Sequence, residues 1–108
     1  MPQARRGEIW MIDFGLAQKP RPAVVLSVPY EGEERALISY VSRTTSARKT
    51  RFEVAHQGRG FEPGAFDAQS IATVPSVRLM RRMGEVDAVT LRQIERAVQS
   101  WLGMSSHP

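Results

Sequence analysis

The sequence predicts a mainly β domain, curled into a small barrel, with one helix at its C-terminal end. A length of 108 residues leaves room for one domain, spanning residues 1–108. Short apolar runs separated by turn residues fill roughly the first three quarters of the chain, and a single helical pattern closes it. With 42% hydrophobic and 24% charged residues, the chain is expected to be globular rather than disordered.

The first half of the chain predicts four strands. Residues 8–14 alternate, and Trp10 and Phe14 mark the side that we expect to face the core. Residues 23–28 are apolar at almost every position, which predicts a strand buried on both faces. The remaining elements are a loop over residues 15–20, a turn over 29–34, a strand over 35–42, a basic loop over 43–49 and a strand over 50–56.

The second half predicts short strands followed by the helix. A Gly-rich turn over residues 57–60 precedes one or two short strands within residues 65–74. Ser76 is expected to cap a single helical turn, and residues 78–86 form an exposed edge strand. Residues 1–5 and 104–108 are expected to be loosely ordered.

The closing helix has a start signal, an apolar stripe and a stop signal. Asp87 is expected to be the N-cap, and Gly103 stands where a C′ glycine belongs. The stripe is expected to pack onto the core, Trp101 included. Its residues are Leu91, Ile94, Val98, Trp101 and Leu102.

Composition excludes several kinds of site. The chain has no Cys, which rules out disulfides, cysteine zinc sites and a thiol nucleophile, and which fits a reducing compartment. It has two His and no metal-ligand spacing, so we expect no metal site and no cofactor. No apolar run reaches the roughly 18 residues of a membrane span, and no signal peptide is visible, so we expect a cytoplasmic protein without membrane contact.

The make-up of the positive charge has two interpretations, one of which is an anionic partner. The net charge is +4, and 13 of the 15 basic residues are Arg, the side chain that binds phosphate with two parallel donors. A bias of the genome toward Arg codons would give the same composition. Nucleic acid is therefore one of two interpretations of the charge.

Three features could carry chemistry. Arg21 lies between Pro20 and Pro22, which restrict the backbone and would hold a cation ready for an anion; the alternative is a solvated Arg on a stiff loop. Residues 43–51 combine hydroxyls with cations that could bind phosphates; the alternative is an ordinary polar hairpin loop. His56 could act as a base; the alternative is a surface residue or one whose hydrogen bonds are satisfied within the protein.

Five blocks of sequence, taken in order, resemble the MazF/PemK family of toxin endoribonucleases. They are residues 6–14 (RGEIWMIDF), 21–27 (RPAVVLS), 44–46 with 51–54 (TTS and RFEV), 68–74 (AQSIATV) and 84–104. The resemblance covers about residues 6–104 and implies a small curled SH3-like β-barrel of the MazF/CcdB-like kind. It also implies a homodimer and a separate antitoxin with an acidic, disordered tail.

The same resemblance implies metal-independent cleavage of single-stranded RNA by attack of the ribose 2′-hydroxyl on the adjacent phosphorus. It assigns the catalytic roles to Arg21 and Thr44, with Arg21 stabilising the phosphorane. The RNA-binding residues that it implies are Lys19, Thr45, Ser46, Arg48, Lys49 and Gln69.

The sequence departs from the family at two places. The first loop, residues 15–20, is shorter than usual and lacks a Glu, which bears on substrate choice. Ala68 stands where some PemK-type members carry a catalytic Asp, and Asp67 comes one residue earlier. A shift of one residue along a strand turns a side chain to the opposite face, so that role is not transferred to Asp67.

Two other functions remain open. The fold also resembles that of CcdB, a toxin that binds DNA gyrase through its terminal helix, and residues 101–104 would be the matching end. A gyrase binder has no use for Arg21 or Thr44, so these two residues discriminate between the functions. The third possibility is an inactive family member that kept the fold.

Overall fold

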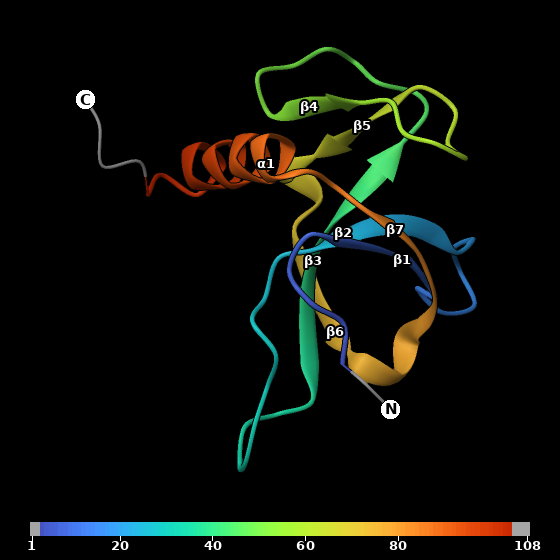
Figure 1. Ribbon diagram of the computed structural model, residues 1–108, viewed down its shortest axis with the longest axis vertical. Helices are drawn as coiled ribbons and strands as arrows, with labels where there is room; N and C mark the ends of the chain where they lie inside the picture. The colour runs from blue at the N-terminus through green and yellow to red at the C-terminus, as the bar shows by residue number, and fades with distance from the viewer. Residues whose placement is uncertain (1–2, 105–108) are drawn as a thin grey trace.

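The computed structural model describes residues 3–104 and contains a seven-stranded sheet and one α-helix (Figure 1). The expectation of loose order at the two ends therefore falls largely on residues 1–2 and 105–108, outside this range, although Ala4 is buried. The elements are β1 (Glu8–Ile12), β2 (Arg21–Val25), β3 (Leu37–Thr44), β4 (Glu53–His56), β5 (Gly64–Asp67), β6 (Ala72–Pro75), β7 (Leu79–Glu85) and α1 (Ala88–Trp101), with 3₁₀ turns η1 (Ala68–Ser70) and η2 (Ser76–Arg78).

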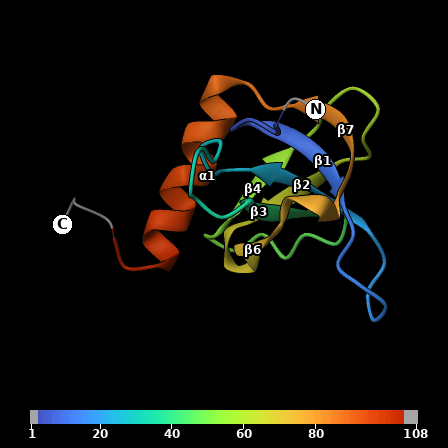
Figure 2. The same ribbon diagram turned by 90° about the horizontal axis from the view of Figure 1, so that it is seen from below.

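All strand pairs are antiparallel, and their order along the sheet is β4-β5-β3-β2-β1-β7. The long strand β3 joins two regions, because its first half pairs with β6 and its last two residues pair with β5. The mainly β architecture with a C-terminal helix is confirmed. The sheet curls without closing, since β4 and β7 end the path unpaired with each other, so the barrel prediction holds only loosely (Figure 2).

Two apolar layers surround β2, as its apolar run predicts. Val24 packs with Phe66 and with Ile94 of α1 on one side. Ala23 packs with Ile12 and Tyr40 on the other. Ala23, Val24 and Val25 have no exposed surface, which confirms burial on both faces for residues 23–25. The prediction is wrong beyond them, because β2 ends at Val25 and Val28 is 68% exposed.

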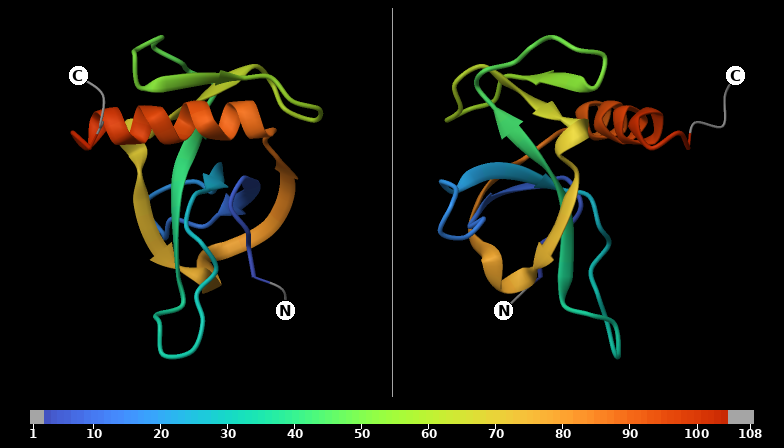
Figure 3. Two further views of the ribbon diagram at one scale, coloured as in Figure 1. Left: turned by 60° about the vertical axis from the view of Figure 1, so that its left-hand side comes forward. Right: turned by 180° about the vertical axis from the view of Figure 1, so that it is seen from behind.

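The β4–β5 hairpin and α1 occupy one end of the molecule, and the curled part of the sheet occupies the other (Figure 3). Helix α1 begins after Asp87, whose Oδ1 accepts a hydrogen bond from the backbone N–H of Thr90 at 2.7 Å, as predicted for the N-cap. Gly103 follows the C-cap with φ of 70°, which also agrees with the prediction.

Several local expectations are wrong. Trp10 and Phe14 pack against the cluster of Ile12, Ala23 and Tyr40, as expected for the core side of the first strand, but the other face of β1 is buried as well, because Ile9 packs with Val24 and has no exposed surface. Ser76 is the first residue of η2 and makes no cap, although the single helical turn is present.

The ends of two elements also differ from expectation. Trp101 is 43% exposed rather than buried with the stripe, and it packs edge-to-face against Phe52. Arg43 and Thr44 belong to β3 and not to the basic loop.

The 14-residue α1, which is the one α-helix among residues 3–104, is too short to cross a bilayer.

Candidate functional site

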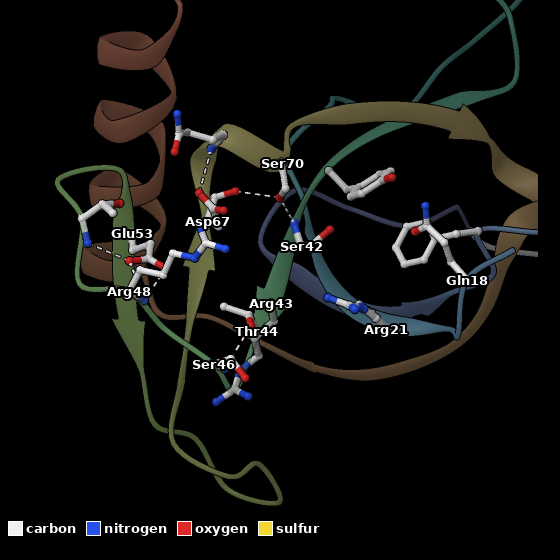
Figure 4. Close-up of a pocket in the computed structure, with 14 residues that line it drawn as sticks. Gln18, Arg21, Ser42, Arg43, Thr44, Ser46, Arg48, Glu53, Asp67 and Ser70 are labelled. Atoms are coloured by element: carbon white, nitrogen blue, oxygen red, sulfur yellow. Dashed lines mark hydrogen bonds between the residues drawn. The ribbon is translucent and has the colours of Figure 1, made fainter.

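An open cavity of about 750 Å³ lies across the C-terminal end of β3 (Figure 4). Its walls come from the start of β2, the end of β3, the loop that follows β3, and η1. Most of its lining is polar. The fourteen lining residues are Phe14, Gln18, Arg21, Tyr40, Ser42, Arg43, Thr44, Ser46, Arg48, Thr50, Glu53, Asp67, Gln69 and Ser70.

Arg21 and Thr44 meet in this cavity because of the register between β2 and β3. The last pair of this ladder sets Ala23 opposite Ser42, and Arg21 and Thr44 lie two residues beyond it along their own strands, where both line the cavity. Arg21 is the first residue of β2 and is exposed, so its guanidinium is free to meet a ligand. Thr44 is the last residue of β3, and its Oγ1 accepts a hydrogen bond from the backbone N–H of Ser46 at 3.0 Å.

The basic loop after β3 is held by a carboxylate. Glu53 accepts hydrogen bonds from the backbone N–H groups of Arg48 and Thr50. These two hydrogen bonds hold the pKa of Glu53 below its usual value. Lys49 takes a positive φ of 58°, a conformation that is uncommon for residues other than glycine. The loop is therefore shaped before any ligand arrives.

The opposite wall is a chain of hydrogen bonds through η1. The hydroxyl of Ser70 donates to the carbonyl of Asp67 at 2.6 Å and accepts from the backbone N–H of Ser42 at 2.9 Å. The Oδ1 atom of Asp67 accepts from the backbone N–H of Gln69 at 3.0 Å. Both Asp67 and Gln69 line the cavity, with Asp67 fixed as the N-cap of η1.

The end of the cavity beyond Arg21 is aromatic. The rings of Phe14 and Tyr40 lie with their centroids 5.6 Å apart, and Gln18 lies beside them on the loop between β1 and β2. Burial raises the pKa of Tyr40, so its hydroxyl stays protonated at neutral pH. A flat apolar surface next to an Arg and an amide can take a stacked base.

The cavity brings together five of the eight residues predicted from sequence: Arg21, Thr44, Ser46, Arg48 and Gln69. Thr45 and Lys49 line a second, more apolar cavity of about 520 Å³ on the other side of the loop. Lys19 is exposed and lines neither of these two cavities. His56 does not line the first cavity either, and it contacts Arg43 instead.

The other nine lining residues are not among the site residues predicted from the sequence. They are Phe14, Gln18, Tyr40, Ser42, Arg43, Thr50, Glu53, Asp67 and Ser70. A continuous strand through residue 68 would turn Asp67 to the opposite face. The strand β5 ends at Asp67 and η1 follows, so the alternation stops there and Asp67 lines the cavity together with Gln69. Phe14 packs against Ile12 and Tyr40 as the sequence predicts, but it lies beyond the end of β1 at Ile12 and also lines the cavity. Within residues 3–104 no three His, Asp or Glu side chains gather closely enough to share a metal ion.

Comparison with known proteins gives one family and one fold. The family model for the PemK-like, MazF-like toxin of type II toxin–antitoxin systems matches residues 5–102. An endoribonuclease from a mycobacterial species, solved in complex with its cognate antitoxin, superposes with a TM-score of 0.83 at 24% identity, covering 96% of this chain and 99% of its own.

Two further solved structures agree. A mycobacterial endoribonuclease has a TM-score of 0.81 at 25% identity, with 100% of this chain and 98% of that chain covered. The MazF of a MazE–MazF complex from Deinococcus radiodurans has a TM-score of 0.82 at 23% identity, with 97% and 100% covered. Because the family model spans nearly the whole chain, this protein belongs to the PemK-like, MazF-like toxins of type II toxin–antitoxin systems.

Proposed function

We propose that this toxin is a metal-independent endoribonuclease that cleaves single-stranded RNA. The observation that carries the proposal is the meeting of Arg21 and Thr44, from two different strands, in one open and mostly polar cavity. Membership in the toxin family and the endoribonuclease activity of the similar mycobacterial proteins support it.

In the proposed reaction the nucleophile belongs to the substrate. The ribose 2′-oxygen forms a bond to the adjacent phosphorus while the bond from phosphorus to the 5′-oxygen breaks. The products are a 2′,3′-cyclic phosphate and a 5′-hydroxyl, and the proton lost from the 2′-hydroxyl is balanced by one gained at the leaving oxygen. The protein has to orient the phosphate and stabilise its developing charge.

Arg21 and Thr44 have distinct roles in this scheme. Arg21 keeps its charge and presents several N–H donors in a fixed plane, so it suits the extra negative charge of the phosphorane better than it suits proton abstraction. Thr44 donates its hydroxyl to a phosphoryl oxygen, while its second interaction, with the N–H of Ser46, fixes the side chain. Single-stranded RNA is required because in-line attack needs a splayed backbone.

The rest of the cavity would bind the neighbouring nucleotides. Ser46 and Arg48 continue the polar wall on one side of Thr44, and Gln69 lies on the other. Lys19 on the loop before β2, and Thr45 and Lys49 beside the second cavity, lie outside this cavity and would add positive charge and a hydroxyl that attract phosphates without reading sequence.

We also propose two protein partners. One is a second copy of the chain in a homodimer, and the other is an antitoxin whose acidic, disordered tail takes the place of RNA in the cavity. The similar mycobacterial and Deinococcus proteins were solved with an antitoxin or MazE. Light scattering that gave only a 12.1 kDa species would contradict the dimer. Failure of the neighbouring reading frame to rescue growth would contradict the antitoxin.

The decisive experiment compares Arg21→Ala and Thr44→Ala with the parent protein on a long RNA in EDTA, with the cut ends mapped by sequencing. Each substitution should lower the cleavage rate by about 10²–10³, with Arg21→Ala at the upper end. Arg35→Ala, which removes an exposed Arg from the loop before β3, is the matched control and should cleave like the parent. Near-parent cleavage by a well-folded Arg21→Ala would refute the assignment.

The competing function, poisoning of DNA gyrase by the terminal helix, has one observation in its favour. Leu102 and Met104 are 49% and 68% exposed next to the half-exposed Trp101. A gyrase binder would keep its toxicity in Arg21→Ala and Thr44→Ala and lose it in Trp101→Ala. Measuring growth arrest by these three variants therefore separates the two functions.

A further inference from the structure

Arg43 is a buried cation directly before Thr44 in β3. It is 4% exposed, the one polar or charged residue buried to this degree among residues 3–104. Its Nε donates to Nδ1 of His56 at 2.8 Å, and its Nη2 donates to the carbonyl of His56 at 3.0 Å and to the carbonyl of Glu62. Its guanidinium carbon lies 4.9 Å from the centre of the Phe61 ring. Every one of these partners belongs to the β4–β5 hairpin.

The bond from Arg43 fixes the state of His56. A guanidinium can only donate hydrogen bonds, so Nδ1 of His56 has to be an acceptor. The imidazole is therefore neutral and carries its proton on Nε2. Adding a second proton would remove the acceptor and place two cations in contact. The hydrogen bond from Nε of Arg43 to Nδ1 of His56 therefore exists only while His56 is neutral.

The β4–β5 hairpin, to which Arg43 is hydrogen-bonded, also packs against the backbone of Thr44. Arg43 pairs with Phe66 and Thr44 pairs with Ala65 in the ladder between β3 and β5. Gly64 comes so close that an added Cβ would stand 2.4 Å from the carbonyl oxygen of Thr44 and 2.9 Å from Nη1 of Arg43. The side chain of Arg43 thus holds in place the element that sets the backbone of Thr44.

We propose that Arg43 and neutral His56 act as positioning residues for Thr44, and that acid switches off RNA cleavage by breaking their hydrogen bond. This inference rests on the endoribonuclease function proposed above. Arg43 lines the cavity, but its Nε and Nη2 donate to the hairpin, and His56 lies outside the cavity, so neither residue needs to touch the RNA for this role. They act through the β4–β5 hairpin, which keeps the Thr44 hydroxyl in its place opposite Arg21.

Charges from four elements surround the pair. Arg43 comes from β3, Glu62 from the hairpin loop, Glu85 from β7, and Asp87 from the start of α1. Burial and the charge of Arg43 lower the pKa of His56 below 6.5, and Asp87 opposes that shift. The rings of Phe61 and Phe66 cover the imidazole at centroid distances of 5.4 and 4.9 Å. The hydrogen bond between Arg43 and His56 is intact at neutral pH and breaks when His56 is protonated, below pH 6.5.

The test measures kcat and KM on a fixed RNA oligonucleotide between pH 5 and pH 8 for the parent, His56→Phe and His56→Asn. His56→Phe keeps an aromatic ring but lacks the acceptor, so kcat should fall about ten- to a hundredfold at every pH, with KM little changed. In His56→Asn the amide oxygen can accept from Nε of Arg43 and does not titrate. This variant should recover most of the lost kcat and should not show the fall in kcat that the parent shows in acid.

Removal of the cation gives a second, matched comparison. Arg43→Met should lower kcat like His56→Phe, whereas Arg59→Met, which removes an exposed Arg from the same hairpin loop, should cleave like the parent. Circular dichroism at each pH separates a loss of positioning from global unfolding. Identical pH profiles in the parent and His56→Asn, or parent-like kcat in a folded His56→Phe, would overturn the proposal.

Amide hydrogen exchange keeps the inference testable without activity. The amides of the β3–β5 ladder, at residues 43–44 and 65–66, should exchange faster in His56→Phe than in the parent and His56→Asn. If the parent cleaves no RNA at any pH, the proposed function fails by itself. Unchanged exchange in His56→Phe would then refute the positioning role independently.

Discussion

Glu53 accepts hydrogen bonds from the backbone N–H of Arg48 at 3.1 and 3.0 Å and from that of Thr50 at 2.7 Å. One carboxylate, at the start of β4, therefore fixes the conformation of the basic loop that precedes the strand. The Glu53 carboxylate orders the backbone of this loop, and the side chain of Arg48 lines the cavity. The hydrogen bonds that lower the pKa of Glu53 are the ones that shape the loop.

Glu53→Ala should weaken RNA binding because the loop loses its internal acceptor. Ordering the loop would cost about 1 kcal/mol more, which raises Kd roughly fivefold. Fluorescence anisotropy with an RNA carrying a 2′-deoxy scissile nucleotide measures this without cleavage. Glu33→Ala, in the exposed turn before β3, is the control for charge and should leave Kd within the experimental error.

The hydrogen bonds of Glu53 also predict that the stability of the fold depends on pH in the acid range. Since the folded-state pKa of Glu53 lies below 4.5, the stability it contributes is present above 4.5 and is lost as the pH falls through the folded pKa. Thermal unfolding of the parent and Glu53→Ala should therefore differ at neutral pH and converge in strong acid. A constant difference down to pH 2 would contradict this role.

RNA affinity should fall with salt. If the cavity and its basic loop neutralise about three phosphates, the slope of log K against log salt is roughly −2 for a single strand. Arg48→Ala or Lys49→Ala should flatten that slope by less than about one unit and leave the cleaved sequence unchanged. A flat response in the parent protein would show that the loop is only a solvated surface.

Gly64→Ala should damage both stability and cleavage. The added methyl group would stand 2.4 Å from the carbonyl oxygen of Thr44, so β5 has to move away from β3. We expect a loss of about 1–3 kcal/mol in the free energy of unfolding and a lower kcat. Urea unfolding and steady-state cleavage measure the two effects.

Gly60→Ala is the control for Gly64→Ala. Gly60 has a positive φ of 83°, but a Cβ there would meet no atom within 4 Å. Its cost of about 1 kcal/mol comes from backbone strain alone, and cleavage should survive. Equal cleavage by the two variants would show that the contact with Thr44 is not needed.

Arg21→Lys should remain a poor enzyme. The substitution keeps the positive charge but replaces a planar set of donors with a single ammonium group, which cannot hold two phosphoryl oxygens in a fixed plane. Cleavage assays should place its rate much nearer to Arg21→Ala than to the parent. A near-parent rate would mean that charge alone, without the guanidinium geometry, stabilises the phosphorane.

Much of the fold follows from patterns that are local in sequence. The apolar run in β2 predicts a strand buried on both faces because every side chain has to leave water. The helix boundaries follow from Asp87 and Gly103, whose preferences act within one turn of the chain. Arg21 stands out through its two flanking prolines, and the resemblance of the Thr-Thr-Ser block to the toxin family pointed to Thr44.

Tertiary structure decided the features that depend on pairing between distant segments. The β3–β5 ladder draws Arg43 into the strand and buries it against His56, although its neighbours in sequence predict a solvated loop. The 3₁₀ turn after β5 ends the strand alternation, so Asp67 enters the cavity wall. At the end of α1, Trp101 packs edge-to-face against Phe52 and stays 43% exposed. Helical periodicity says which residues share a face but not how far the opposing surface extends.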